Sequence, residues 1–140
     1  MDEQLERAAR WLMEDPRMMA VWGFGSRVHG GAGPASDVDL AVLLDPQTAA
    51  HLDLAEELRL RSRVVEELRR DDVDLVILDS APPLLRDEAV AAGRRLFARD
   101  EEVADRSEER AARECWDTAH LRRVQQEIAR EAREARGGAE

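Results

Sequence analysis

Two apolar runs flank a glycine-rich segment near the N-terminus, and this arrangement limits the folds open to the chain. Residues 18–24 are almost entirely apolar, and residues 37–44 end in the run Leu40-Ala41-Val42-Leu43-Leu44. Apolar runs of this length, bounded by turn-forming residues, are typical of buried strands. About a dozen residues separate the two runs, which is long for a hairpin. Loops of this kind usually hold a ligand, so we expect a binding site between the two strands.

Aspartates stand within or beside two of the apolar runs. Asp37 and Asp39 are two residues apart, so their side chains point to the same face of a strand. Asp74 occupies a comparable position in a third apolar run, residues 73–78. Charge is costly in apolar surroundings unless it is paired or bound to a metal. We therefore expect the three carboxylates to share one site, with Asp72 as the rival for the third position.

A glycine-serine turn follows the first apolar run. Gly25-Ser26 would offer backbone N–H groups and a hydroxyl to a polyphosphate, and the glycines after it let the backbone approach a ligand closely. Carboxylates together with phosphate oxygens can hold one or two Mg²⁺ ions. A two-metal arrangement clamps the attacking and leaving oxygens of an in-line displacement. The segment thus predicts a site for a divalent metal and a polyphosphate.

The remaining chain alternates between helical and extended patterns. Apolar spacing and breaker residues predict helices over 3–14, 49–70 (with Thr48 as N-cap), 83–92 (ended by Gly93) and 101–136, and a short extended segment at 95–97. This order indicates a small α/β domain of two or three layers. The last helix has a thin apolar stripe, so we expect it to bend or to pack against a partner.

Composition narrows the possible partners and locations. The 140 residues suggest one domain, and the net charge of −10 argues against non-specific nucleic-acid binding. No apolar run is long enough for a membrane helix, and the acidic N-terminus lacks a signal-peptide pattern. The single cysteine, Cys115, fits a reducing compartment and is interpreted as a buried thiol. We therefore expect a cytoplasmic protein that contacts neither nucleic acid nor membrane directly.

The spacing of the polar residues matches a known family pattern. Ten residues separate Gly25-Ser26 from Asp37-Val38-Asp39. This pattern resembles the nucleotidyltransferase superfamily that includes DNA polymerase beta. Further runs are similar to its minimal (MNT) branch, the MntA-like antitoxins of HEPN–MNT toxin–antitoxin pairs, and the resemblance covers roughly residues 5–100. These runs are Val73-Asp74-Leu75-Val76, Ala81-Pro82-Pro83-Leu84-Leu85-Arg86 and residues 93–100.

The resemblance implies a fold and a set of site residues. The fold would be the minimal nucleotidyltransferase fold, a small mixed β-sheet flanked by helices, over residues 1–100. Residues 101–140 would form a helical extension that belongs to the same domain or binds a partner. Asp37, Asp39 and Asp74 would hold Mg²⁺ and serve catalysis. The nucleotide would be bound by Gly25, Ser26, Arg27, Gly30 and Ser36.

The resemblance also implies an activity and a partner. Members of the MntA-like branch transfer AMP from ATP to a tyrosine of the cognate HEPN ribonuclease, which silences it, and the two proteins form a complex. One departure is His29, where the branch often has arginine, and His29 carries charge only when protonated. Two alternatives stay open. The chain could be a small-molecule nucleotidyltransferase of the aminoglycoside type, or an antitoxin that acts by binding alone.

Overall fold

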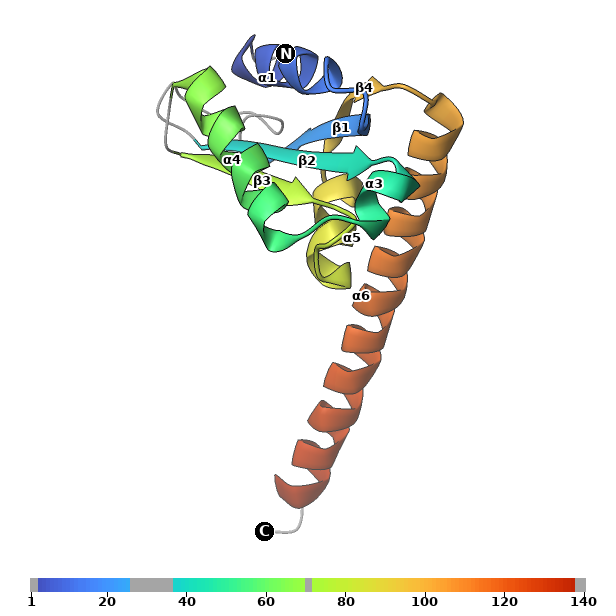
Figure 1. Cartoon of the computed structure of the whole chain (residues 1–140). Coiled ribbons are helices and arrows are strands. Elements are labelled where there is room, and N and C mark those ends of the chain that lie inside the picture. Colours follow the sequence, from blue (N-terminus) through green and yellow to red (C-terminus); the bar gives the residue numbers. More distant parts are fainter. Residues whose placement is uncertain (1–2, 26–36, 70–71, 138–140) are drawn as a thin grey trace.

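A mixed four-stranded sheet forms the centre of the computed structural model, which describes residues 3–25, 37–69 and 72–137 (Figure 1). The strand order is β3-β2-β1-β4. β1 runs antiparallel to β2 and β4, whereas β2 and β3 are parallel. The three apolar runs are strands, as expected, and the segment around residues 95–97 is a fourth. The bounds are β1 Met18–Phe24, β2 Val38–Leu44, β3 Val73–Ile77 and β4 Arg94–Ala98.

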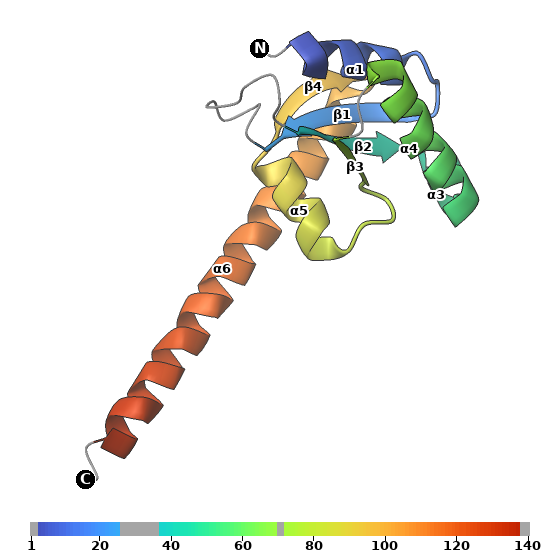
Figure 2. The same cartoon turned by 90° about the vertical axis from the view of Figure 1, so that its left-hand side faces the viewer.

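Helices cover both faces of this sheet, which makes a three-layer domain (Figures 1 and 2). Helices α1 (Glu3–Met13) and α4 (Leu54–Leu68) lie on one face. Helix α5 (Pro83–Ala91) and the first part of α6 (Glu101–Gly137) lie on the other. The described architecture is thus the expected mixed sheet flanked by helices, with a long C-terminal helix.

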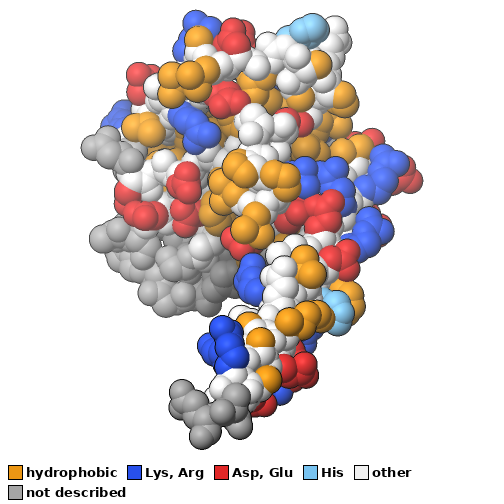
Figure 3. All heavy atoms as spheres, turned by 90° about the horizontal axis from the view of Figure 1, so that it is seen from below, with side chains coloured by type: hydrophobic (Ala, Val, Ile, Leu, Met, Phe, Trp, Pro, Cys, Tyr) orange, Lys and Arg blue, Asp and Glu red, His pale blue; other side chains and the backbone are white. Residues whose placement is uncertain are grey.

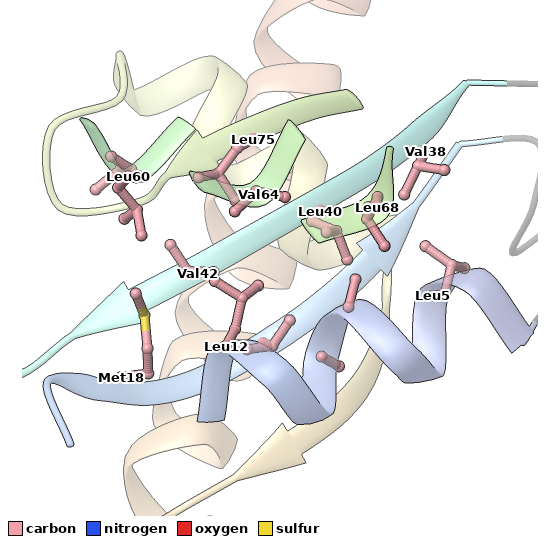
Figure 4. Close-up of a cluster of buried hydrophobic side chains, with 14 of the residues drawn as sticks. Leu5, Leu12, Met18, Val38, Leu40, Val42, Leu60, Val64, Leu68 and Leu75 are labelled. Carbon is pink, nitrogen blue, oxygen red and sulfur yellow. The ribbon is translucent and has the colours of Figure 1, made fainter. Parts of the chain in front are cut away.

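The larger hydrophobic core lies between the sheet and helices α1 and α4 (Figure 4). Alternate residues of each strand supply it, because successive side chains of a strand point to opposite faces. Full burial of each leucine or valine stabilises the fold by about 1.5–3 kcal/mol. Its members larger than alanine are Leu5, Leu12, Met18, Val21, Val38, Leu40, Val42, Leu44, Leu60, Val64, Leu68, Leu75 and Ile77.

The second core lies on the opposite face and fixes the start of α6. Trp22 is fully buried there, among alanines and valines of the sheet, α5 and α6. Its indole Nε1 donates a 2.9 Å hydrogen bond to Oε1 of Glu108 on α6. The guanidinium of Arg95 on β4 donates to the same carboxylate, at 3.1 Å and 2.7 Å. One glutamate of α6 is therefore tied to two adjacent strands.

The single helix expected over residues 49–70 is wrong, because the chain forms two helices there. Helix α3 spans Pro46–Ala50 and α4 begins at Leu54. The predicted N-cap, Thr48, instead donates its backbone N–H to the Asp45 carboxylate at 3.0 Å. Asp53 caps the second helix by accepting from the Glu56 N–H at 2.8 Å. Two aspartate caps eight residues apart start two helices, since each satisfies free N–H groups.

Helix α6 is continuous and leaves the domain after its first turns (Figures 1 and 2). Its 37 residues correspond to about 55 Å. Of these residues only Ala104 and Ala111 are buried. Cys115 is half-buried rather than buried, and this partial burial raises the pKa of its thiol. None of the helices in the described ranges is long and apolar enough to span a membrane.

Candidate functional site

Two of the three predicted aspartates lie side by side on adjacent strands of the sheet. The parallel ladder between β2 and β3 pairs Asp39 with Asp74. Asp39 lies two residues before Ala41 and Asp74 two residues before Val76, and both of these belong to the core under α5 and α6. Side chains two apart on a strand share a face, and neighbouring strands are about 4.8 Å apart. The two carboxylates therefore lie side by side on the α5–α6 face.

Gly25, the residue that follows β1, lies directly against Asp39 of this pair. Gly25 has a φ of +78°, and a Cβ at this position would stand 2.1 Å from Oδ2 of Asp39. Only glycine fits, because any side chain would collide with the carboxylate and the positive φ disfavours other residues. The antiparallel pairing of Phe24 with Asp39 sets this approach. The backbone of the predicted phosphate turn thus begins next to the predicted metal ligand.

Asp37 lies one residue before β2 and is exposed. The Val38 N–H donates to the backbone carbonyl of Asp72 at 3.0 Å, which joins the two chain segments that enter β2 and β3. The residue paired with Asp39 is Asp74, two positions beyond Asp72. The register therefore favours Asp74 over Asp72 as the carboxylate beside Asp39.

The expected apolar setting of Asp74 is not found. Asp74 is exposed and Asp39 is half-buried. β3 is a short edge strand, and burial begins only at Leu75. Asp74 instead lines a hollow of about 170 Å³ at this edge, together with Arg61 and Leu85. An exposed carboxylate of this kind is accessible to a bound ligand.

The donor set fits a magnesium ion held together with a nucleotide. Within residues 3–25, 37–69 and 72–137, no three carboxylate, imidazole or thiol groups come together as a metal cluster. Mg²⁺ at nucleotide sites takes one or two carboxylates from the protein, and phosphates and waters complete its octahedron. Asp39 and Asp74 supply such a pair. The other predicted nucleotide-binding residues, Ser26, Arg27, Gly30 and Ser36, lie outside the described residues, as does His29.

A groove at the opposite end of the same sheet face was not predicted from the sequence. It has a volume of about 840 Å³ and lies between α3 and α6. Arg106, Arg110 and Arg113 line it from α6. Asp79 lies there too and accepts the Leu44 N–H at 2.9 Å, while partial burial raises the pKa of its carboxyl group. The available signal was the three-to-four-residue spacing of the arginines, which places them on one side of a helix.

Solved structures similar to this chain include toxin–antitoxin complexes. A chain of a toxin–antitoxin complex with AMP-PNP is 26% identical, with a TM-score of 0.66 over 91% of this chain and 97% of that chain. A chain of a mutant MntA-HpeT complex is 25% identical, with a TM-score of 0.65 over the same shares.

A third structure shows likeness of fold alone. It is a complex of an MNT antitoxin with a tri-AMPylated HEPN toxin from Shewanella oneidensis. The matched chain is 22% identical, with a TM-score of 0.59 over 92% of this chain and 98% of that chain.

The family assignment rests on the sequence region that contains the site. No curated protein matches the chain. The family model described as polymerase beta, nucleotidyltransferase matches residues 6–102, which include all four strands and Asp37, Asp39 and Asp74. With the pairing of Asp39 and Asp74 and the likeness to solved antitoxin complexes, the resemblance expected from the sequence is confirmed. The chain belongs to the polymerase beta nucleotidyltransferase family.

Proposed function

We propose that this protein is an antitoxin that transfers AMP from ATP to a tyrosine hydroxyl of a cognate HEPN ribonuclease toxin. The observation that carries the proposal is the pairing of Asp39 with Asp74 beneath the Gly25 turn. The 26% identical chain in a toxin–antitoxin complex with AMP-PNP supports both the nucleotide and the class of partner. The choice of tyrosine and of AMP transfer rests on the family resemblance.

The proposed roles divide between the turn and the strands. Gly25 and Ser26 bind the phosphates, together with Arg27, Gly30 and Ser36. Asp37, Asp39 and Asp74 hold Mg²⁺, of which two ions are proposed. When bound, Mg²⁺ neutralises the phosphate oxygens and orients them for in-line attack. Gly25 keeps its backbone close to the Asp39 carboxylate, which brings phosphate and metal ligands together.

The reaction is a displacement at the α-phosphorus of ATP. The tyrosine oxygen forms a bond to this phosphorus, and the bond to the oxygen that bridges to the β-phosphate breaks. Pyrophosphate leaves with the bonding electrons, and the hydroxyl proton passes to a carboxylate. Asp74 is the proposed acceptor of this proton, because it is exposed at the strand edge where a partner can approach. Positioning and charge neutralisation supply most of the catalysis in such transfers.

A labelling experiment tests the proposal. The full chain is incubated with ATP labelled in the α-phosphate, Mg²⁺ and the proposed cognate HEPN protein. We expect label on the HEPN protein, and loss of that label with the double variant Asp37→Asn/Asp39→Asn. The variant Glu66→Gln/Glu134→Gln removes two charges from exposed helical positions and is the matched control. Strong labelling by the aspartate variant would refute the assigned site.

A second candidate function is neutralisation by binding alone. Exposed apolar side chains on α6 favour it, because Trp116 and Ile128 are each 61% exposed. A toxicity assay separates the two functions. If Asp37→Asn/Asp39→Asn protects cells from the toxin as fully as the unaltered chain, binding alone suffices. The remaining alternative is a small-molecule nucleotidyltransferase. A screen that compares small hydroxyl acceptors, including aminoglycosides, with the toxin as acceptors of AMP tests it.

A further inference from the structure

One side of α6 carries a series of residues spaced three or four apart over most of its length. Residues with this spacing share one helix face, because each residue turns the helix by about 100°. The face continues from the part of α6 that lies against the domain into the part that projects away. Its members are Val103, Arg106, Arg110, Arg113, Asp117, Leu121, Val124 and Ile128, and we call it the docking face.

The upper part of the docking face forms one wall of the groove between α3 and α6. The other wall includes Pro46, Ala49 and Ala50, and the floor is made by Leu43 and Leu44 at the end of β2 and by Met19. This is a largely apolar groove whose α6 wall carries three arginines and Glu109, with Asp79 also lining it. Its volume of about 840 Å³ is large enough for several side chains of a partner.

Within the described residues, the three arginines of this wall have no carboxylate within ion-pair distance, unlike Arg17, Arg86 and Arg95, and they share this with most other arginines. Arg17, Arg86 and Arg95 each form an ion pair at 2.5–2.8 Å with a neighbouring carboxylate. For Arg106, Arg110 and Arg113 the described residues provide no ion pair within 4.0 Å, and all three are exposed. In a chain of net charge −10, three cations left available in a groove indicate an acidic partner surface.

The lower part of the docking face is apolar and exposed. Leu121 is 58% exposed, Val124 41% and Ile128 61%. Figure 3 shows hydrophobic side chains along the projecting part of α6, among charged ones. Apolar residues spaced three and four apart are the anchors that a helix offers to another amphipathic helix. The face thus changes along its length from cationic to apolar.

A second copy of the chain is a poor occupant of this face. In a parallel pair of α6 helices, each arginine of the groove would face its own copy. In an antiparallel pair centred on Val124, Asp117 would lie opposite Glu131, Arg113 opposite Ala135, and Arg110 beyond the end of the other α6 at Gly137. Both arrangements leave the groove arginines without an acidic partner and set like charges against each other, which is destabilising across helix pairs. The charge pattern therefore favours a different protein.

We infer that the docking face binds an amphipathic helix of a partner protein, whose acidic end enters the groove and whose apolar residues cover Leu121, Val124 and Ile128. This inference goes beyond the proposed transfer reaction, because a surface of this chemistry requires no nucleotide. Charge pairs in the partly enclosed groove set the direction and register of the partner helix, and the apolar part adds buried area.

Two synthetic helical peptides test the inference on the full chain without ATP. Both have roughly 20 residues and leucines at positions i, i+3, i+4 and i+7, and they differ only in three glutamates or three lysines at one end. We expect the acidic peptide to bind roughly tenfold more tightly or better, with an affinity that falls as salt is raised. Equal affinities of the two peptides would overturn the inference.

Matched charge-reversal variants locate the site. Arg106→Glu/Arg110→Glu/Arg113→Glu should weaken binding of the acidic peptide roughly tenfold or more. Arg122→Glu/Arg123→Glu/Arg133→Glu changes the net charge equally on other sides of the exposed helix and should change binding less than about twofold. Equal losses would mean that net charge alone acts, and would refute the site. Circular dichroism melts confirm that both variants stay folded.

Separate experiments test the apolar part of the docking face and the exclusion of a second copy of the chain. Leu121→Ser/Ile128→Ser should also weaken peptide binding, and an unchanged affinity would restrict the site to the groove and refute the extended face. Sedimentation velocity is expected to show a monomer. A dimer dissolved by Leu121→Ser/Ile128→Ser would assign the face to a second copy and overturn the inference. Because ATP is absent throughout, these outcomes are independent of adenylyl transfer.

Discussion

The two ends of one sheet face carry opposite charge and are built in different ways. At the starts of β2 and β3, Asp39 and Asp74 are placed by strand register, and Gly25 lies against Asp39. At the other end, Arg110 and its neighbours on α6 line a groove whose floor includes Leu43. The acidic end therefore depends closely on backbone geometry, namely on the register between β2 and β3 and on the approach of Gly25 to Asp39. The basic end depends on which side chains one helix presents, and it should tolerate backbone change better.

The largest effect is expected at the acidic end, where two variants distinguish the role of Asp74 from that of Asp72. Asp74→Asn should lower the rate of AMP transfer about 100-fold or more, because it removes the carboxylate paired with Asp39. Asp72→Asn is the matched control and should change the rate less than about threefold, since the ladder places Asp72 two residues away from that pair. Initial rates with labelled ATP measure both. A greater loss with Asp72→Asn would assign the third position to Asp72.

The second prediction tests how strictly geometry governs the acidic end. Gly25→Ala should destabilise the fold by about 2 kcal/mol, because the new Cβ would stand 2.1 Å from the Asp39 carboxylate at a φ of +78°. The rate of AMP transfer should also fall, because the Asp39 carboxylate must move away from the new Cβ. Gly137→Ala is the control, because nothing lies within 4 Å of a Cβ there. Urea unfolding measures both, and equal stabilities would show that the turn adapts easily.

A third prediction concerns the connection between the two ends. Trp22→Phe removes the hydrogen bond to Glu108 and part of a fully buried side chain, at a cost of about 2 kcal/mol. Glu108 keeps its ion pair with Arg95. We therefore expect peptide binding in the groove to weaken only to the extent that the first turns of α6 become more mobile. Thermal melts and amide exchange in residues 101–111 measure this, and unchanged protection there would show that packing alone holds α6.

The smallest effect is expected at Asp79 in the basic end. Partial burial, with a smaller contribution from Asp45, raises the pKa of this carboxyl group above 3.8. The favourable contribution of the protonated form is complete below about pH 3.8 and is lost as pH rises through the higher folded-state pKa. Asp79→Asn should thus gain a small amount of stability relative to the unaltered chain as the pH rises from about 4. Melts over this rise in pH measure it, and a constant difference would contradict it.

The sequence was sufficient for the parts of the fold that depend on local patterns. The apolar runs marked β1, β2 and β3, and the thin stripe of residues 101–136 predicted a helix with little core of its own. The break between α3 and α4 was missed because both segments share a helical pattern and the Asp53 cap was not recognised. The exposure of Asp74 was missed because burial at an edge strand depends on which elements cover it.

The geometry of the site was less predictable for a related reason. Spacing alone shows that Asp37 and Asp39 can share a face, but which residue of β3 stands beside Asp39 depends on the register between strands that are far apart in sequence. The groove depends on where α6 crosses the sheet, which no local pattern specifies. The roles of Asp37, Asp39 and Asp74 in catalysis stay predictions that the rate measurements above decide.

Because α6 is one continuous helix, two properties of its docking face can be changed separately. One is the distance between the groove arginines and the apolar residues, and the other is the rotation of these two groups relative to each other around the helix axis. Two residues separate the helix from β4, so the edge of the sheet fixes its rotation. One alanine inserted after Thr118 would turn Leu121 and Ile128 by about 100° relative to the groove arginines while moving them only about 1.5 Å. Seven inserted residues would restore the phase to within about 20° while adding about 10 Å. For a partner that contacts both parts, the single insertion would interrupt the continuous docking face, whereas the seven-residue insertion would lengthen it.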